Sequence, residues 1–284
     1  MRHNEASRTT QRPALLRAAH QLLDDDPKIH VDPLAVGLIP EASPESIRAE
    51  EKLIRSPEYT LLRSTFVLRA RYAEDSLAAA ALCGVSQYVI LGAGLDTFAY
   101  RQPEYAQSMQ IFEVDHPASQ TWKRERLAAR EISLPQNLRY VAVDFERDSL
   151  AQRLFENGFS TEHPTFFSWL GVVMFLTGPS IESTLGFIAR LPRRSALTLS
   201  FIVPHECLVG EDLDLARYSV ESCASRGEPW LSLHRPEELR AIVHRAGFSQ
   251  AEHFAPDAAT ERYFHHRKDG LRAPRHEQLL TAWV

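Results

Sequence analysis

The feature that most constrains this chain is an alternation of strand-like and helical segments that begins at residue 88. Tyr88–Leu91 is apolar throughout, as expected of a strand that is buried on both faces of a parallel sheet. Such alternation predicts an α/β fold with a doubly wound sheet and right-handed crossovers. The remaining strands are expected at Gln110–Val114, Leu138–Val143, Thr165–Phe167 and Ala196–Val203, and at an antiparallel edge formed by Gln250–Phe254 and Gln278–Val284.

Helical segments come before the first strand and predict a cap over the sheet. Residues 11–24 carry apolar side chains at helical spacing, and Glu58–Cys83 is a long helical stretch that Gly84 ends. The predicted division is therefore an N-terminal arm and helical cap in residues 1–84 and a core in residues 85–284. An insertion of the core, about residues 205–235, is expected to cover the substrate side.

Composition and charge exclude several classes of protein. Hydrophobic residues make up 44% of the 284 residues and charged residues 24%, as in a soluble globular protein. A net charge of −5 argues against nucleic-acid binding, and no apolar run approaches the roughly 18 residues that span a membrane. Three cysteines are too few and too scattered for a disulfide framework or a zinc site, and no histidine spacing suggests a metal. The start, MRHNEASRTTQRP, lacks the apolar region of a secretory signal, so a frayed arm and a cytoplasmic location are expected.

The residues that follow each strand are the candidates for ligand binding. Ligands of a doubly wound sheet bind at the carboxyl ends of the strands. Gly92, Ala93 and Gly94 follow the first predicted strand, Asp115 follows the second, and Asp144 follows the third. The run LDTFAYR after the glycines is expected to begin a helix.

These residues fit a nicotinamide dinucleotide less well than they fit S-adenosylmethionine. A dinucleotide loop reads G-x-G-x-x-G, but Thr97 stands where the third glycine belongs. The carboxylate of Asp96 would also compete with a pyrophosphate for the positive end of a helix. S-adenosylmethionine has no phosphate, and Asp115 can accept hydrogen bonds from its ribose. Asp144 can accept from its adenine, with Phe145 against the ring. A dinucleotide-dependent oxidoreductase stays the alternative, and an acidic residue after a strand also caps helices.

The ordered motifs VILGAGLDTFAYR, FEVDHP…KRERL, VAVDFERD and FFSWLGVVMFLT resemble the leucine carboxyl methyltransferase-like family of S-adenosylmethionine-dependent O-methyltransferases. The resemblance covers roughly residues 45 to 270, and the tail ERYFHHRKDGLRAP is similar to the bacterial natural-product branch, which includes the tetracenomycin-pathway carboxyl O-methyltransferase. It implies a class I methyltransferase (Rossmann-like) fold with a seven-stranded sheet and a helical cap.

The resemblance also implies roles for individual residues. Gly92 and Gly94 match the family's cofactor loop, Asp115 its ribose-binding acid, and Asp144 with Phe145 its adenine-binding pair. Arg71, in RARYAED, matches the arginine that binds the cofactor's carboxylate, and a bidentate guanidinium suits that group. An ion pair of Arg71 with Glu74 or Asp75 is the alternative. Leu170 stands where many members have a glutamate near the cofactor's amino group. A binding protein without activity is therefore a further alternative.

The expected reaction is methyl transfer to an oxygen of a small acceptor, such as a carboxylate or phenol of a polyketide-like natural product. A carboxylic acid, with a pKa of about 4, is ionised at neutral pH, whereas a phenol, with a pKa of about 10, gains from a general base. His205 follows the fifth strand and is the candidate base, with Glu206 to orient it, although a loop histidine is the plainer interpretation. Through Leu208, Leu213, Leu215, Tyr218, Trp230 and Leu233 the insertion is expected to line an apolar pocket. The alternatives are that these residues simply bury the insertion or form a homodimer face.

Overall fold

The computed structural model describes residues 11–39 and 42–284. Most of the predicted polar arm lies outside these residues, and its last three residues, Gln11–Pro13, instead begin the first helix. Ten α-helices are found in the described residues: α1 (Gln11–Leu23), α2 (Pro44–Ala49), α3 (Glu51–Ile54), α4 (Pro57–Leu82), α5 (Pro117–Ala129), α6 (Leu150–Glu156), α7 (Gly178–Ile188), α8 (Gly210–Ala224), α9 (Pro236–Ala246) and α10 (Pro256–Ala259).

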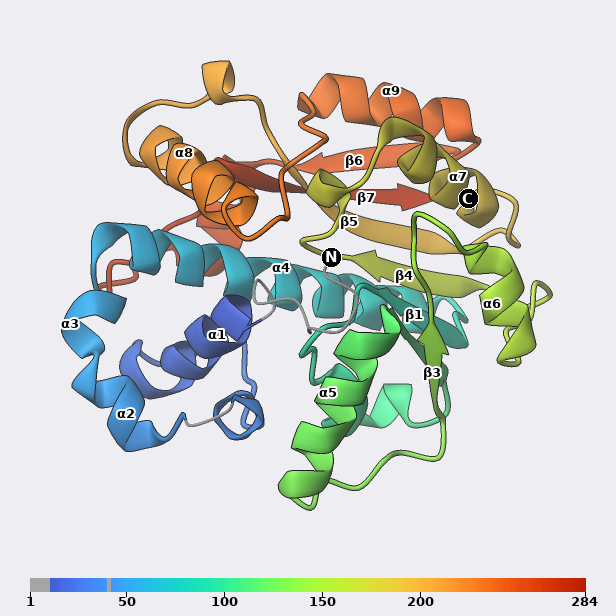
Figure 1. The fold of residues 1–284 in the computed structure, drawn as a ribbon. Coiled ribbons are helices and arrows are strands. Elements are labelled where there is room, and N and C mark those ends of the chain that lie inside the picture. The colour runs from blue at the N-terminus through green and yellow to red at the C-terminus, as the bar shows by residue number, and fades with distance from the viewer. Residues whose placement is uncertain (1–10, 40–41) are drawn as a thin grey trace.

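A seven-stranded sheet crosses the molecule in the order β3-β2-β1-β4-β5-β7-β6 (Figure 1). Its strands are β1 (Gln87–Leu91), β2 (Gln110–Asp115), β3 (Leu138–Ala142), β4 (Thr165–Trp169), β5 (Ala196–Ile202), β6 (Gln250–Phe254) and β7 (Glu277–Trp283). The pairs among β1 to β5 are parallel, whereas β7 runs antiparallel to both β5 and β6. The predicted antiparallel edge is therefore present, and its inner strand lies beside β5.

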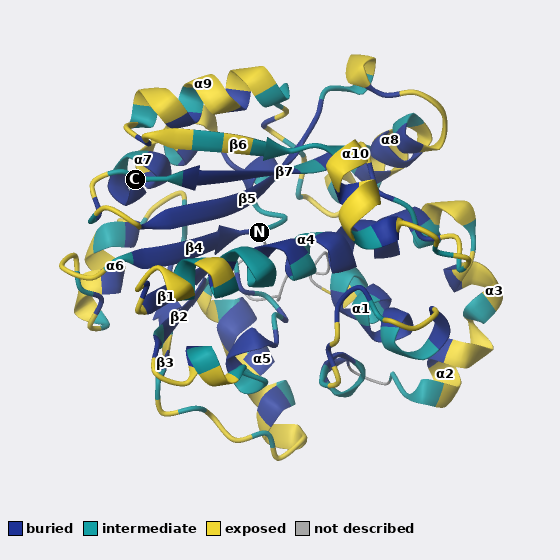
Figure 2. Ribbon diagram, turned by 180° about the vertical axis from the view of Figure 1, so that it is seen from behind, coloured by how far each residue is buried: buried dark blue, intermediate teal, exposed yellow. Residues whose placement is uncertain are grey.

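The sheet is covered on both faces, which explains why β1 is apolar throughout. Val89 and Leu91 pack into a cluster with side chains of α6, α7 and α9. Tyr88 and Ile90 point to the opposite face, where they pack with Leu77 of α4. The inner strands are dark blue in Figure 2, whereas the edge strand β6 is largely intermediate or exposed. Since the ends of β1, β2 and β4 are in register, their following loops meet at one edge.

The helices α1, α2 and α3 pack with the first half of α4 and with α8 to form the cap. A buried ion pair holds this layer together: Nε of Arg63 donates to Oδ2 of Asp24 at 2.7 Å, and Nδ1 of His20 lies 2.8 Å from the same oxygen. Because the second half of α4 packs against the sheet, this helix belongs to both layers.

A second buried ion pair joins α5 to the sheet. Nζ of Lys123 donates to Oε2 of Glu113 at 2.7 Å, and both side chains are at most 2% exposed. The hydroxyl of Tyr100 lies 3.3 Å from the same oxygen and 2.6 Å from the hydroxyl of Tyr140. Burial raises the pKa of Glu113 to about 7, although the ammonium of Lys123 opposes this shift.

The helix expected directly after the glycines is absent, and only a 3-10 turn forms at Phe98–Tyr100. Oδ1 of Asp96 accepts from the N–H of Phe98 at 2.8 Å, as an aspartate at a helix start does, but the chain does not continue into an α-helix. Arg101 then leaves the turn toward Glu74 of α4.

In residues 11–39 and 42–284 no helix is long and apolar enough to cross a membrane. The same residues contain no group of three or more histidine, cysteine, aspartate or glutamate side chains placed to hold a metal ion.

Candidate functional site

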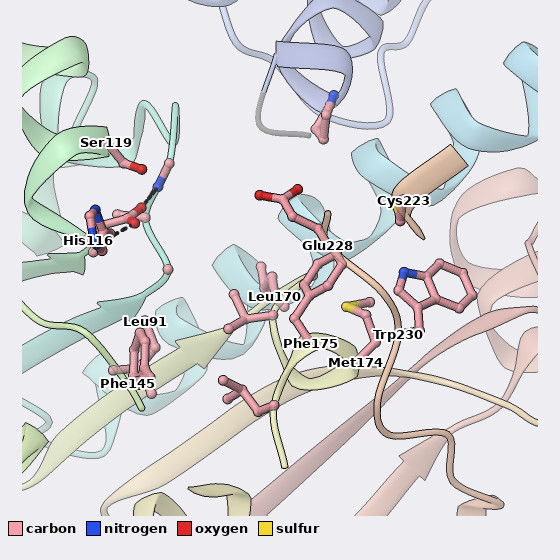
Figure 3. Close-up of a pocket in the computed structure, with 18 of the residues that line it drawn as sticks. Leu91, His116, Ser119, Phe145, Leu170, Met174, Phe175, Cys223, Glu228 and Trp230 are labelled. Carbon is pink, nitrogen blue, oxygen red and sulfur yellow. Dashed lines mark hydrogen bonds between the residues drawn. The ribbon is translucent and has the colours of Figure 1, made fainter. Parts of the chain in front are cut away.

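A cavity of about 530 Å³ opens at the edge where the parallel strands end. Its wall combines the loops after β1 to β4 with parts of α1, α4 and α8 and with the residues that begin β7. Figure 3 shows two sides, with Leu170 between them. We call them the loop side (Leu91, His116, Ser119 and Phe145) and the insertion side (Met174, Phe175, Cys223, Glu228 and Trp230).

The loop after β1 requires a glycine at position 92. Gly92 has a φ of +69°, in the left-handed region that other residues rarely adopt. A Cβ added there would lie 2.3 Å from Cγ2 of Val172. The N–H groups of Gly92 and Ala93 donate to the carbonyl of Val114 at 2.8 and 3.1 Å, so the loop turns over the end of β2.

Asp115, at the end of β2, is held by two backbone groups. Its Oδ2 accepts from the N–H of Gly94 at 2.5 Å, and its Oδ1 accepts from the N–H of His116 at 2.6 Å. Burial raises the pKa of Asp115, and these two N–H groups oppose that shift. A carboxylate has about four acceptor positions, so two bonds leave capacity for a ligand in the cavity.

Asp144 and Phe145 follow β3 and also line the cavity. Oδ1 of Asp144 accepts from the N–H of Glu146 at 3.0 Å, so this carboxylate shapes its own turn. Phe145 lies beside Leu91 on the loop side (Figure 3). Its ring is partly buried against the core and leaves one part open to the cavity.

The structure places Arg71 outside the described wall of the cavity, contrary to the expectation for a cofactor-binding arginine. Its Nε lies 2.9 Å from Oδ1 of Asp75, which is the alternative named above. Arg69 lines the cavity instead, and its Nη1 donates to Oε1 of Glu277 at 3.0 Å. Residues two positions apart on a helix point about 200° apart, so only one of the two arginines can face the cavity.

Leu170 lines the cavity as an apolar side chain, and a carboxylate reaches the same wall from another strand. Glu277, the first residue of β7, is only 6% exposed and pairs with Arg69. The guanidinium of Arg69 lies against the backbone of Gly171, where an added Cβ would lie 2.5 Å from its Nη1. The chain therefore has both an arginine and a carboxylate beside Leu170.

His205 is not among the described residues that line the cavity. It begins a 3-10 turn, His205–Cys207, and its Nε2 is buried without a hydrogen bond in the described structure. Glu206 does not orient it, since the carboxylate of Glu206 accepts from Arg235 at 3.0 Å. The geometry thus removes His205 as the candidate base.

His276 was missed by the sequence analysis and does line the cavity. It directly precedes β7, and an antiparallel strand begins at the edge where its parallel neighbours end. The pairing of Ile202 with Glu277 brings this residue beside the end of β5. The predicted antiparallel edge was therefore the available signal, because a strand that runs antiparallel to its neighbours begins where they end.

The insertion contributes differently from the expectation. Trp230 lines the cavity, together with Cys223 and Glu228. Leu208 and Leu215 are instead buried in the two hydrophobic cores. Outside the expected set, Met174 and Phe175 after β4 complete the apolar surface of the insertion side (Figure 3). The other residues proposed for this pocket, Leu213, Tyr218 and Leu233, are not in its described wall.

The cap is tied to the glycine loop by charged side chains. Nη2 of Arg17, in α1, donates to the carbonyl of Leu95 at 2.5 Å, and its Nε lies 3.5 Å from Asp32. Arg101, which follows the same loop, pairs with Glu74 of α4. Burial raises the pKa of Glu74, but its cationic neighbours outweigh this effect and hold the value at about 2.

Comparisons with known proteins agree with this architecture. A family model described as leucine carboxyl methyltransferase matches residues 10–189. The chain is 33% identical over 294 aligned residues to a protein of Bacillus subtilis (strain 168) named putative S-adenosyl-L-methionine-dependent methyltransferase YktD, and the alignment covers 96% of each chain. This chain belongs to the leucine carboxyl methyltransferase family. A further relative of the same description, from Saccharopolyspora erythraea, is 29% identical over 71% of this chain and 69% of its own length.

Solved structures show the fold of this leucine carboxyl methyltransferase family member. A putative methyltransferase from Thermobifida fusca superposes with a TM-score of 0.61 at 16% identity, over 99% of this chain and 96% of that one. A DUF574 family protein from Streptomyces avermitilis gives a TM-score of 0.58 at 17% identity, over 98% and 97%. The expected class I methyltransferase fold is thereby confirmed.

Proposed function

We propose that this protein transfers a methyl group from S-adenosylmethionine to an oxygen atom of a small, largely apolar acceptor. The observation that carries the proposal is Asp115, whose carboxylate is fixed by Gly94 and His116 at the cavity wall. The expected cofactor is confirmed by relatives such as YktD, whose names include it.

The residues of the loop side fit the adenosine part of this cofactor. Gly92 contributes only its backbone to the cavity wall, since it has no side chain of its own. Asp115 retains acceptor positions for the two ribose hydroxyls, and Asp144 and Phe145 follow the next strand, where the adenine would lie. When bound, S-adenosylmethionine supplies a methyl group on a positively charged sulfur, and this methyl group is a strong electrophile. The cofactor contains no phosphate.

We assign the amino-acid end of the cofactor to Arg69 and Glu277. Arg69 offers a planar fork to the carboxylate, and Glu277 offers an acceptor to the ammonium. The two side chains are already paired at 3.0 Å and largely buried, so their orientation is fixed before the ligand arrives. With this assignment, Glu277 provides the carboxylate that many family members have at the position of Leu170.

The insertion side supports an apolar acceptor. Met174, Phe175 and Trp230 give it a hydrophobic and aromatic surface (Figure 3). Such a surface suits a polyketide-like natural product with a carboxylate or a phenol. The wall excludes water and aligns the acceptor oxygen with the methyl group, which is the main requirement of an in-line displacement.

Replacing Asp115 by alanine is expected to weaken S-adenosylmethionine binding by about 1–3 kcal/mol, the loss typical of a hydrogen bond to a charged group. Isothermal titration calorimetry measures this directly. Asp214→Ala, an exposed position of α8 outside the described cavity wall, is the matched control. Unchanged affinity in Asp115→Ala would refute the ribose assignment. Methyl transfer itself is tested by mass spectrometry of acids and phenols incubated with protein and cofactor, where a product heavier by one methyl group is expected.

The two arginines of α4 provide a matched pair of variants. Arg69→Ala is expected to weaken S-adenosylmethionine binding by about 1.5–3 kcal/mol, since it removes a charge-assisted hydrogen bond and leaves Glu277 unpaired. Arg71→Ala removes an exposed ion pair with Asp75, and its effect on affinity should be at most a few tenths of a kcal/mol. The reverse order of effects, again by calorimetry, would return the carboxylate-binding role to Arg71.

A further inference from the structure

The inference concerns His276 and rests on the proposed methyl transfer. His276 stands directly before β7, and the N–H of Val203 donates to its carbonyl at 3.0 Å. This bond fixes the backbone of His276 at the end of β5. Its neighbour Glu277 pairs with Arg69, whose guanidinium lies against Gly171. His276 therefore lies in the same part of the wall as the residues assigned to the cofactor's amino-acid end.

One side of the His276 ring is buried against a carboxylate. Nδ1 is buried without a hydrogen-bond partner in the described structure, and the nearest carboxylate oxygen given for it is Oδ1 of Asp212, in α8, at the ion-pair distance of 3.5 Å. The side chain as a whole is 3% exposed, and His276 lines the cavity, so the rest of the ring provides its exposed surface. The ring thus has one nitrogen toward a carboxylate and its other edge toward the cavity.

Asp212 is held rigidly in this position. Its Oδ1 accepts from the N–H of Arg275 at 2.7 Å, and its Oδ2 accepts from Nη1 of Arg272 at 2.8 Å. Burial raises the pKa of Asp212, but His276, the Arg275 N–H and Arg272 outweigh this effect and lower it to about 2. Asp212 is therefore a carboxylate at neutral pH. The charged groups around His276 are Asp212 from α8, Arg272 and Arg275 before β7, Glu277 in β7 and Arg69 from α4.

We propose that His276 is the general base of the reaction, that Asp212 positions it, and that the acceptor is a hydroxyl group of phenolic or enolic type. As the new carbon–oxygen bond forms and the carbon–sulfur bond breaks, the bonding electron pair stays on sulfur and the hydroxyl proton passes to Nε2 of His276. A carboxylate acceptor is already ionised and needs no base. A buried histidine that lines the cavity, with a carboxylate behind it, is suited to the less acidic hydroxyl.

The first experiment measures whether a bound phenol keeps its hydroxyl proton, in a complex in which no methyl transfer can occur. 4-Nitrophenol absorbs differently as phenol and as phenolate, and 4-nitrobenzoate is a probe of similar shape that is already ionised. With S-adenosylhomocysteine present, wild-type protein should bind 4-nitrophenol and shift its ionisation toward phenolate. His276→Gln should lose the shift, whereas His205→Gln, outside the described cavity wall, should keep it. Binding of 4-nitrobenzoate alone, of neither probe, or an unchanged shift in His276→Gln would overturn the proposal.

The second experiment is kinetic. It uses the hydroxyl acceptor that is methylated fastest in the mass-spectrometric screen. His276→Gln should lower kcat by about 10²- to 10⁴-fold with little change in KM. Asp212→Asn should lower kcat less than His276→Gln does, again with little change in KM and with unchanged affinity for S-adenosylmethionine. A structural role would raise KM or weaken cofactor binding together with kcat, and so would overturn the assignment. Methylation of carboxylic acids alone would do the same.

Calorimetry with S-adenosylmethionine separates this proposal from the proposed function. Normal cofactor binding by His276→Gln with lost transfer supports the base. Absence of cofactor binding in the wild-type protein would instead contradict the proposed function itself. If Asp212→Asn does not fold, the nitrophenol shift in wild-type protein and His276→Gln decides the question without it.

Discussion

Replacing Gly92 by alanine is expected to destabilise the protein by about 2–5 kcal/mol and to weaken S-adenosylmethionine binding at least tenfold. The left-handed backbone costs an alanine about 1–2 kcal/mol, and the contact with Val172 adds about 1–3 kcal/mol of overpacking. The new Cβ, 2.3 Å from Cγ2 of Val172, must push the loop or the residue after β4 away. Both surfaces belong to the cavity wall, so stability and binding fall together.

Gly158→Ala is the matched control for this variant. Gly158 also has a positive φ, +87°, but a Cβ added there would meet no atom within 4 Å. It should therefore show the backbone cost alone, about 1–2 kcal/mol, with cofactor affinity unchanged. Chemical denaturation and calorimetry of the two variants separate the effects. Equal losses in both variants would mean that the close approach of Val172 has no energetic consequence.

Replacing Lys123 by methionine is expected to cost about 3–5 kcal/mol of unfolding free energy near neutral pH, because it leaves the carboxylate of Glu113 buried without its cation. Arg153→Met is the matched control, since its pair with Asp148 is partly exposed and should contribute at most about 1 kcal/mol. The measurement is the midpoint and slope of urea unfolding for both variants.

The same pair predicts a pH dependence with a definite sign. The folded pKa of Glu113, about 7, lies above the usual value of 4.5, so the native state holds a proton that the unfolded chain has lost. Between these two values the contribution of Glu113 to stability falls as pH rises. Lys123→Met should widen this window, so its cost should be smaller near about pH 5 than near about pH 8. An equal cost at both pH values would contradict the assignment of the effect to Glu113.

The sheet was predictable because its signals are local and repeated. β1 and β4 are largely apolar runs, and the strand predicted at Tyr88–Leu91 differs from β1 by one residue. The glycine loop was equally visible, since the positive φ of Gly92 and the acid at the end of β2 are tied to fixed positions after strands. The helix expected after that loop was wrong, because the chain forms only the 3-10 turn Phe98–Tyr100 there.

The choice between Arg69 and Arg71 depended on tertiary structure. In an amphipathic helix the polar residues indicate the exposed face. The first part of α4 is instead buried by the cap, α8 and the sheet, so apolar residues surround both arginines in the sequence. The pattern of apolar residues therefore does not indicate which of the two arginines faces the cavity. The pairing of Arg69 with Glu277 joins residues 208 positions apart, and no local pattern indicates such a contact.

The sequence indicated His205 rather than His276 as the candidate base for a related reason. His205 follows a parallel strand, where ligand contacts are expected, but the chain immediately enters a 3-10 turn that leads the side chain away from the cavity wall. His276 precedes a strand, and only the reversed direction of β7 places it at the same edge. The position of His276 at the cavity thus depends on the order and direction of the strands, which are properties of the whole sheet.

The bond from Arg17 to the carbonyl of Leu95 makes the first helix a partner in ligand affinity. Whatever free energy a molecule gains by ordering the glycine turn is shared, through thermodynamic linkage, with the docking of α1.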